Sequence, residues 1–422
     1  MKTFLIFIVM AVSLFGFAGG GGSSSGDGSG YSGGSGYSGG GSYSGSSDGD
    51  GEFTWEGLVF AIVLITVYIL IMTSKEKDGK RIYLKNQREL NAKDQNSTKQ
   101  EKWIHEEAER IFRQYQQDWS EYNLGNIQKY TTDSYFRHAS LMLDAINRMG
   151  RRNVVSNLAI TRTILCTRVN DETNLPITVQ LAFEFGGTDS LIGADMKHLI
   201  YSSSAQGIVE YWDFIYDGES LRLGGITQST ESAPHLIKSI AEFAKENNLF
   251  YSSDWGRLAL PTRGLIFSGY DVLKNADVNN HVVGKWNNCL VQIYTYSAMP
   301  GDPSSYYIVG QMNIPKSYEG VIVEAKKAKL RVVKPKNYDK FDMEWGDFNR
   351  RYNVFAASRD ALPAFELLNP KFMERLYERN LPYNLEVKDN TIYIFARVKE
   401  AKEEDYAELL NVLSEAFNEL RM

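Results

Sequence analysis

The sequence predicts an α+β protein in which two domains follow a membrane-spanning segment. An uncharged apolar run precedes the body of the chain, and two later segments have the three- and four-residue apolar spacing of buried helices. Several segments with the β-rich patterns of strands come after them. Helices followed by a series of strands are typical of α+β domains, and 422 residues suffice for two or three domains.

The overall composition excludes several classes of protein. The chain has 46 Lys and Arg against 52 Asp and Glu, so it is not basic throughout and nucleic acid is not an expected partner. Two cysteines, Cys166 and Cys289, are too few for a disulfide framework or a tetrahedral thiolate zinc site. An aromatic content of 13% argues against a largely disordered chain.

The first 52 residues predict a signal peptide and a flexible tether. Residues 1–18 have one positive charge and an apolar run, with Gly16 and Ala18 as small residues before a cut; an uncleaved anchor helix is the alternative. Residues 19–52 form the predicted disordered tether, of which 19–51 consist of 16 Gly, 11 Ser, 3 Tyr and 3 Asp. Its regularly spaced tyrosines fit self-association, binding of cell-wall sugar, or a bare spacer.

Residues 53–73 are predicted to cross a membrane as a helix. Leu58 to Met72 carries no charge, and a helix of about 20 residues spans about 30 Å of hydrocarbon. Acidic residues precede the span and a basic linker, 74–98, follows it, so the body is predicted to be cytoplasmic. The membrane-proximal basic residues either bind anionic lipid or only set the topology. They are Lys75, Lys77, Lys80 and Arg81.

Residues 99–230 predict a first α+β domain. Apolar residues recur on one face over 99–122, and a second helix is expected over Thr132 to Met149. Strands are expected at Val154–Val169, Ile177–Phe185, Met196–Ser202, Gly207–Tyr216 and Ser220–Leu223. Residues 186–190, of sequence Gly-Gly-Thr-Asp-Ser, are expected to form a turn between strands, and Gly224 and Gly225 a hairpin or bulge.

Residues 231–422 predict a second α+β domain. A helix is expected over Ala233 to Asn248, and helices near the end of the chain at Lys371–Glu378 and Glu403–Arg421. Strands are expected at Leu258–Phe267, Trp286–Tyr296, Tyr306–Met312, Gly320–Val333 and Thr391–Val398.

A spaced pattern in the first domain resembles the Tim-forty-four-like domain family. The matching residues are Ile111, Phe112, Gln116, Trp119, Asn123, Tyr130, Thr131, Tyr135, Leu141, Asn153, Val155, Ile160 and Val209 to Phe214. The family includes the anchor subunit of the mitochondrial inner-membrane translocase and bacterial relatives. The resemblance implies a cone-shaped fold of the nuclear transport factor two-like kind, with a curved sheet around an apolar pocket. It also implies binding of membrane lipid or partner proteins, and no catalytic motif.

The second domain resembles a domain of unknown function in bacterial membrane-anchored proteins. The matching phrases are Asn280–Gly284, Phe348–Val354 and Leu368–Glu374. This resemblance implies a second domain and a bacterial source. Together with the predicted span and its flanking charges, the expected location is the bacterial inner (cell) membrane, single-pass, with the body cytoplasmic. The resemblance implies no activity.

Aromatic side chains of the first domain are the predicted ligand pocket. The helix at 99–122 contributes four rings and the strand at 207–216 two, and together they would suit an acyl chain or an apolar peptide side chain. A fully packed core without a cavity is the alternative. The predicted pocket residues are Trp103, Phe112, Tyr115, Trp119, Trp212 and Phe214.

No motif in the sequence predicts catalysis. Phosphate-loop and nucleophile-elbow motifs are absent from the sequence, the five histidines are scattered, and no metal or cofactor is expected. One enzymatic alternative remains, in which Glu210 shares a strand face with Trp212 and Phe214 and acts as a base, as in isomerases or hydrolases of cone-shaped fold. A structural organiser acting through the external tether is a third class.

The sequence therefore predicts a membrane-anchored, non-enzymatic binding or scaffold protein. Its expected partners are membrane lipid and a membrane or cytoplasmic protein of unknown identity. Its oligomeric state is not predicted.

Overall fold

The computed structural model describes residues 15–17, 20–22, 98–167, 169, 174–193, 195–228, 237–254, 277–297, 306–328, 336–379 and 382–420. The predicted transmembrane segment 53–73 and the basic residues of the linker lie outside these ranges, as do the strand expected at Leu258–Phe267 and nearly all of the predicted signal peptide and tether. Two short strands, β1 (Phe15–Phe17) and β2 (Gly20–Gly22), pair antiparallel. Within the described ranges, no helix is both long and apolar enough to cross a bilayer.

The helices of the first domain begin and end at local capping signals. Helix α3 (Lys99–Glu121) starts at a capping box in which Thr98 and Glu101 satisfy each other's backbone N–H groups. It ends at Tyr122, whose left-handed φ of 61° terminates the helix. A short turn of helix, α4 (Leu124–Ile127), and a 3-10 helix, η3 (Gln128–Tyr130), lead to helix α5 (Asp133–Arg148), where Thr132 is the N-cap.

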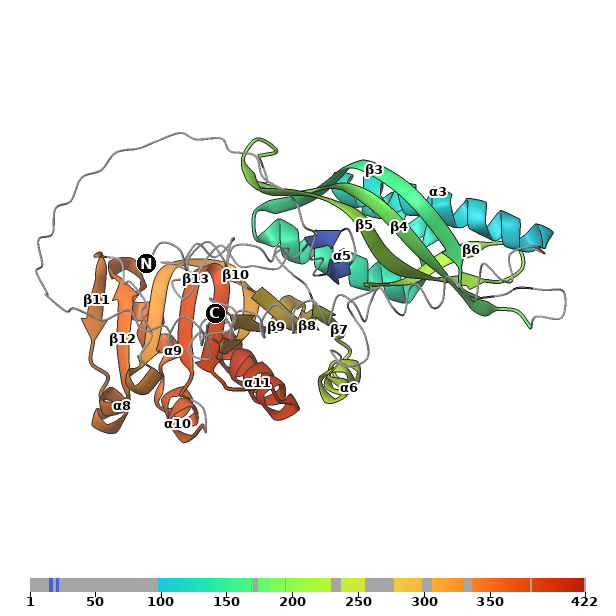
Figure 1. Cartoon of the computed structure of the whole chain (residues 1–422). Coiled ribbons are helices and arrows are strands. Elements are labelled where there is room, and N and C mark those ends of the chain that lie inside the picture. The colour runs from blue at the N-terminus through green and yellow to red at the C-terminus, as the bar shows by residue number, and fades with distance from the viewer. Residues whose placement is uncertain are drawn as a thin grey trace, which may run out of the picture.

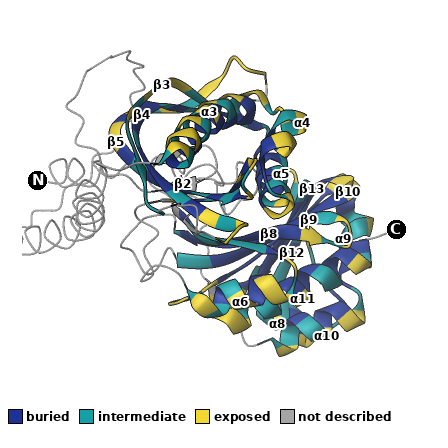
Figure 2. Cartoon of the chain, turned by 90° about the vertical axis from the view of Figure 1, so that its right-hand side faces the viewer, coloured by how far each residue is buried: buried dark blue, intermediate teal, exposed yellow. Residues whose placement is uncertain are grey.

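Four antiparallel strands form the sheet of the first domain, in chain order. They are β3 (Arg151–Leu165), β4 (Ile177–Gly193), β5 (Leu199–Tyr216) and β6 (Leu221–Gln228). The sheet curves around α3 (Figure 2). Apolar side chains of α3 and α5 fill the concave side, so the core of this domain lies between the helices and the sheet.

The turn expected at residues 186–190 is wrong, because β4 runs through it. A register shift against β5 occurs between Phe185 and Gly187, so the glycines mark a bulge within a long strand. The Gly224–Gly225 pair also lies at a register shift, opposite Asp213 and Phe214, as the bulge alternative predicted.

A seven-stranded antiparallel sheet forms the second domain. Its order is β11-β12-β10-β9-β8-β7, and β13 pairs with β10. The strands are β7 (Phe250–Asp254), β8 (Asp277–Trp286), β9 (Cys289–Ser297), β10 (Tyr306–Ala325), β11 (Tyr338–Phe341), β12 (Tyr352–Ala357) and β13 (Asn384–Arg397). Strand β10 pairs with three strands. Its first half pairs with β9 and its last residues with β12 along one edge, and β13 pairs along the other edge.

Helices cover the side of this sheet that faces away from the first domain (Figure 1). They are α6 (Lys238–Glu246), α8 (Gly346–Arg351), α9 (Ala361–Leu367), α10 (Pro370–Glu378) and α11 (Glu403–Leu420), with 3-10 helices at Lys326–Ala328 and Ser358–Asp360. Gly310 of β10 lets α11 approach closely, because a Cβ there would lie 2.7 Å from a methyl carbon of Leu413.

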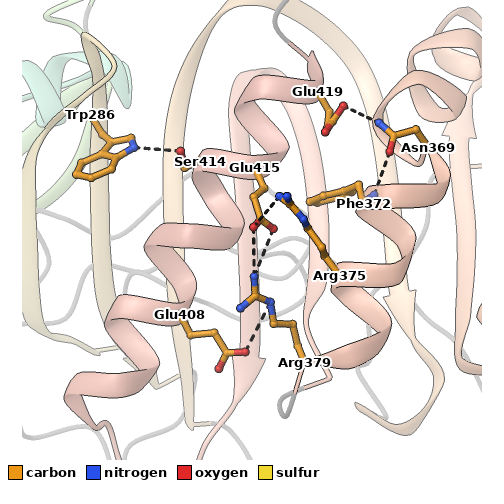
Figure 3. Close-up of polar contacts among 9 residues, drawn as sticks. All are labelled: Trp286, Asn369, Phe372, Arg375, Arg379, Glu408, Ser414, Glu415 and Glu419. Atoms are coloured by element: carbon orange, nitrogen blue, oxygen red, sulfur yellow. Dashed lines mark hydrogen bonds and ion pairs between the residues drawn. The ribbon is translucent and has the colours of Figure 1, made fainter.

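Ion pairs join α10 to α11 on this outer side (Figure 3). Glu415 of α11 accepts from Arg375 at 2.8 Å and from Arg379 at 3.4 Å, and Arg379 also lies 3.9 Å from Glu408. Asn369, the N-cap of α10, donates to Glu419 at 2.6 Å. These contacts fix the start and the body of α10 against the last helix of the chain.

The two domains meet where α5 packs against β7, β8 and β9 (Figure 2). Leu141 and Ala145 of α5 contact Val283 and Leu290 of the second sheet. Arg137 donates to Asn248 at 3.1 Å. The inner face of the second sheet therefore belongs partly to the core of the first domain. The protein has an α+β fold with antiparallel sheets, as the sequence predicted.

Candidate functional site

Five of the six predicted pocket residues come together in the first domain. Phe112 lies 4.8 Å from Trp212, and Tyr115 lies 5.5 Å from Trp212 and 5.8 Å from Trp119, measured between ring centroids. Phe214 lies 6.2 Å from Trp212. All five are buried. Because the ring of Tyr115 contacts both indoles, these side chains pack on one another as core.

Trp103, the sixth predicted pocket residue, lies apart from this group. It sits one turn into α3, its ring centroid is 5.9 Å from that of Tyr216, and 39% of its surface is exposed. Helical spacing put Trp103 on the face of the other rings, but it lies at the end of the domain, where the sheet covers only part of that face.

Strand β5 alternates as the sequence predicted, so Glu210 faces the interior with Trp212 and Phe214. The carboxylate of Glu210 accepts a hydrogen bond of 3.0 Å from the indole N–H of Trp212. A buried carboxyl and a buried indole thus satisfy each other. The proposed base of the enzymatic alternative is inward-facing and hydrogen-bonded.

Another buried carboxyl near these rings, that of Asp189, was not predicted. The indole N–H of Trp119 donates to Oδ1 of Asn153 at 2.9 Å, and the amide of Asn153 donates to Oδ1 of Asp189. Burial raises the pKa of Asp189 to about 7, and the charge of Glu210 acts in the same direction while the hydrogen bond from Asn153 opposes it. The sequence did not point to Asp189, because it lies in the stretch 186–190 that was expected to form a turn between strands.

Two tyrosines and one glutamine complete the interior. The hydroxyl groups of Tyr115 and Tyr135 lie 3.1 Å apart, and burial raises both pKa values above the usual range, so both remain neutral at physiological pH. Gln116, on α3 one turn after Phe112, is buried and has no hydrogen-bond partner for its side-chain amide within the described ranges.

In this aromatic core Asp189 and Glu210 are paired with neighbouring side chains, whereas the side-chain amide of Gln116 has no partner among the described residues. Each carboxyl is hydrogen-bonded to a neighbouring side chain, an arrangement that stabilises a buried acid. Across the described parts of the chain, no cluster of three or more His, Cys, Asp or Glu residues could hold a metal ion.

The partly exposed surface at the start of α3 is the more accessible candidate. Tyr216, beside Trp103, donates to the carbonyl oxygen of Gly218 at 3.0 Å. The side chain of Leu175 lies over Gly218, because a Cβ at Gly218 would be 2.9 Å from a methyl carbon of Leu175. Leu175 is 43% exposed. We call the partly exposed Trp103 and Leu175, together with the buried Tyr216 beside Trp103, the Trp103 surface. Sequence reasoning did not bring Leu175 to this place, because it precedes β4 in a loop.

Comparisons with known proteins give a likeness only among solved structures. No protein-family model matches the chain, and no curated protein matches it. Among solved structures, the crystal structure of the mycobacterial trehalose monomycolate transport factor A, TtfA, is similar at 13% sequence identity and a TM-score of 0.33. The match covers 44% of this chain and 93% of that chain.

Proposed function

We propose that this chain is a membrane-anchored, non-enzymatic binding or scaffold protein whose first domain contacts the lipid surface through the Trp103 surface. Residues 53–73 anchor it in a bacterial inner (cell) membrane, with the body on the cytoplasmic side. A protein of the membrane or cytoplasm is its second partner. The first domain is proposed to have the cone-shaped, nuclear transport factor two-like fold of the Tim-forty-four-like family, which the curvature of its sheet around α3 supports (Figure 2).

The exposure of Trp103 at the start of α3 and of Leu175 in the loop before β4 is the observation that carries this proposal. Indole rings favour the boundary between headgroups and acyl chains, because the ring is apolar and its N–H remains hydrated. Leu175, which lies over Gly218, adds exposed apolar area, and each Å² removed from water contributes about 25 cal/mol. Thr98 caps α3 at this end, so the ring of Trp103 has a fixed position in the first turns of the helix.

The chain reaches the Trp103 surface directly from the predicted span. Residues 74–97 separate the predicted span from Thr98. The start of α3 is therefore the part of the described body that follows the proposed anchor most closely in the sequence. Confinement by an anchor raises the effective concentration of a weak lipid contact.

The charges beside the Trp103 surface are mixed. Lys99 and Lys102 are exposed on the first turn of α3, whereas Asp217 and Glu219 lie in the turn after β5. Attraction to anionic lipid is therefore assigned to the linker residues Lys75, Lys77, Lys80 and Arg81, at about 1 kcal/mol for each basic residue. The Trp103 surface supplies the apolar contact.

An enzyme with a pocket carboxylate is the second candidate function. Asp189 favours it, because a buried carboxyl whose pKa is about 7 can exchange a proton at physiological pH. Against it, Asp189 is held by Asn153 and Glu210 by Trp212. Both acids therefore have structural partners. A binding function is favoured, because it uses the exposed side chains of the Trp103 surface.

Depth measurements on the full chain would test lipid contact. We would place the chain in nanodiscs, replace Cys166 and Cys289 by Ala, and attach an environment-sensitive fluorophore to Cys introduced as Leu175→Cys. The expected result is a blue-shifted emission that acyl-chain bromine atoms quench. Leu362→Cys is the matched control, because Leu362 of α9 is a leucine that is 68% exposed in the second domain.

The two labelled positions decide the proposal. Quenching at position 175 together with none at position 362 supports contact between the Trp103 surface and the bilayer. Equal quenching at both positions, or quenching at neither, contradicts it. Trp103→Ser in the labelled chain should reduce the quenching at position 175, since the indole supplies most of the apolar contact.

A further inference from the structure

Arg151, the first residue of β3, is a buried cation without a hydrogen-bond acceptor. Its side chain is 1% exposed. All three guanidinium nitrogens, Nε, Nη1 and Nη2, are buried and have no hydrogen-bond partner among the described residues. No carboxylate in the described ranges forms an ion pair with it. Five N–H groups of a fixed planar fork are thus directed into the protein without a partner.

The surroundings of Arg151 come from the second domain. The phenol groups of Tyr393 on β13 and Tyr294 on β9 are the groups that act electrostatically on the guanidinium. Both phenols are buried, and burial raises the pKa of Tyr294 well above its usual range, so Tyr294 does not supply a negative charge. Arg151 therefore faces the inner side of the second sheet, across the junction between the domains.

Polar side chains form a strip on that side of the sheet. Tyr294 donates to Oε1 of Gln311 at 2.9 Å, and Gln311 is in register with Tyr393 on one side and Gln292 on the other. His281 and Gln292 lie 2.9 Å apart, between Nε2 and Oε1. These hydroxyl and amide groups continue the polar environment from Arg151 across four strands.

A buried guanidinium without a counter-ion is costly. Transfer of an ion from water into a protein interior costs several kcal/mol even after relaxation. Arginine is also the side chain best suited to phosphate or carboxylate oxygens, because two parallel N–H groups match two oxygens. A ligand oxyanion would satisfy both the charge and the unpaired donors.

We propose that Arg151 is the centre of an oxyanion-binding site between the two domains. The ligand is a phosphate group, held by the guanidinium and by polar groups beside Tyr294 and Tyr393. The phosphate comes either from a free phosphate compound or from the phosphomonoester head group of an anionic phospholipid, which phosphatidylcholine lacks. This site lies away from the Trp103 surface and does not depend on the proposed membrane contact.

Entry of the ligand requires the domains to separate transiently. Because the side chain of Arg151 is 1% exposed, α5 and the second sheet must open before an anion can reach it. The association rate constant of the ligand should therefore be lower than that of a typical diffusional encounter. Arg137→Ala, which removes the hydrogen bond to Asn248 across the junction, should accelerate it.

Thermal unfolding of the full chain in phosphatidylcholine nanodiscs would test the site. Inorganic phosphate would be titrated at constant ionic strength against chloride, and in a second arm part of the phosphatidylcholine would be replaced by phosphatidic acid without free phosphate. A ligand that binds only the folded state raises the unfolding temperature in a saturable way. We expect this rise in at least one arm, and the arm identifies the source of the phosphate.

Three variants test whether the guanidinium of Arg151 is responsible for phosphate binding. Arg151→Met should abolish the rise, and without phosphate it should unfold at the same or a higher temperature than the original chain, because an apolar side chain replaces an unpaired ion. Arg151→Lys should bind phosphate about tenfold or more weakly, since it loses the two-pronged contact. Arg152→Met is the matched control, because the guanidinium of Arg152 lies 5.1 Å from the ring of Tyr122 and away from this site.

Several outcomes would overturn the proposal. These are no shift beyond that of chloride in either arm, an equal shift in Arg151→Met and the original chain, or an equal loss in Arg152→Met. A large drop in the unfolding temperature of Arg151→Met without phosphate would also overturn it, since the guanidinium would then have a structural partner.

Discussion

His138 of α5 stacks on Phe250 of β7, with 4.9 Å between the ring centroids and an angle of 3° between the planes. Arg137, the preceding residue, places its guanidinium 5.6 Å from the centre of the same ring. One aromatic ring of the second domain thus contacts two consecutive side chains of the first. This contact joins the domains at the end of α5 nearest to β7.

The His138 contact predicts a loss of stability in acid. Burial lowers the pKa of His138 to about 4, below the ordinary value of 6.5, so the folded state favours the neutral imidazole. The contribution to stability is complete above pH 6.5 and is lost as the pH falls towards 4. His281 changes in the same direction, because burial lowers its pKa to about 3. His138→Phe should keep the stacking and reduce the pH dependence of the unfolding free energy. His198→Gln, at an exposed position, is the control, and an unchanged pH dependence in His138→Phe would contradict the prediction.

Asp189 predicts the opposite dependence at higher pH. Its pKa is raised to about 7 by burial, so the folded state holds a proton that the unfolded state releases near pH 4. The unfolding free energy should therefore decrease as the pH rises from about 4 to 7 and be constant in this respect above that. Asp189→Asn keeps the shape and cannot ionise, so the variant should gain stability relative to the original chain between pH 5 and 8. Urea unfolding at several pH values measures this difference, and a constant difference would count against it.

Trp119 and Trp103 should differ sharply in their importance to stability. Trp119→Phe replaces a buried indole by a smaller ring and leaves Oδ1 of Asn153 without its hydrogen-bond donor. The change should cost about 2–4 kcal/mol of unfolding free energy. Trp103→Phe changes a partly exposed residue and should cost about 0.5 kcal/mol or less. Denaturant unfolding of both variants checks the contrast, and similar costs would show that Trp103 belongs to the core.

Glu415 should stabilise the second domain in a salt-dependent way. It pairs with Arg375 and Arg379 at the junction of α10 and α11 (Figure 3). Glu415→Gln should cost about 1 kcal/mol at low salt and less at high salt, because the pairs are only partly buried. Asp347→Asn, which removes the exposed pair with Arg350 at 2.7 Å, is the matched control and should change stability very little. Equal effects in both variants would be inconsistent with a network.

The proposed topology predicts a labelling pattern in whole cells. A thiol introduced as Ser35→Cys should react with a reagent that does not cross membranes, because residue 35 lies before the predicted span. Ser252→Cys should be spared in intact cells and react after lysis. Labelling of position 252 alone in intact cells would reverse the proposed orientation.

Much of the architecture could be predicted because local patterns determine it. Ile111, Tyr115 and Trp119 repeat at helical intervals and lie on the buried side of α3, and Glu210, Trp212 and Phe214 alternate onto one face of β5. The order of two helices followed by strands came from such periods, although the segments expected at Met196–Ser202 and Gly207–Tyr216 belong to one strand, β5.

The remaining features depend on contacts between distant parts of the chain. Glycines at 186 and 187 signal a turn in isolation, and only pairing with β5 shows that they are a bulge. A single arginine at the start of a strand resembles any surface residue, so the burial of Arg151 depends on how the second domain packs against the first. The stacking of His138 on Phe250 has the same origin, since the two residues lie far apart in the sequence.

The three partners of β10 constrain the order in which the chain can fold during synthesis. Residues 99–228 contain all four strands of the first sheet, so this domain can fold while the ribosome is still translating the second. One edge of β10 remains unpaired until β13 is synthesised, and Gly310 remains uncovered until Leu413 of the last helix is synthesised. A premature stop codon before residue 384 would therefore release a chain with a folded first half and an open, apolar strand edge. Such products should be degraded or aggregate.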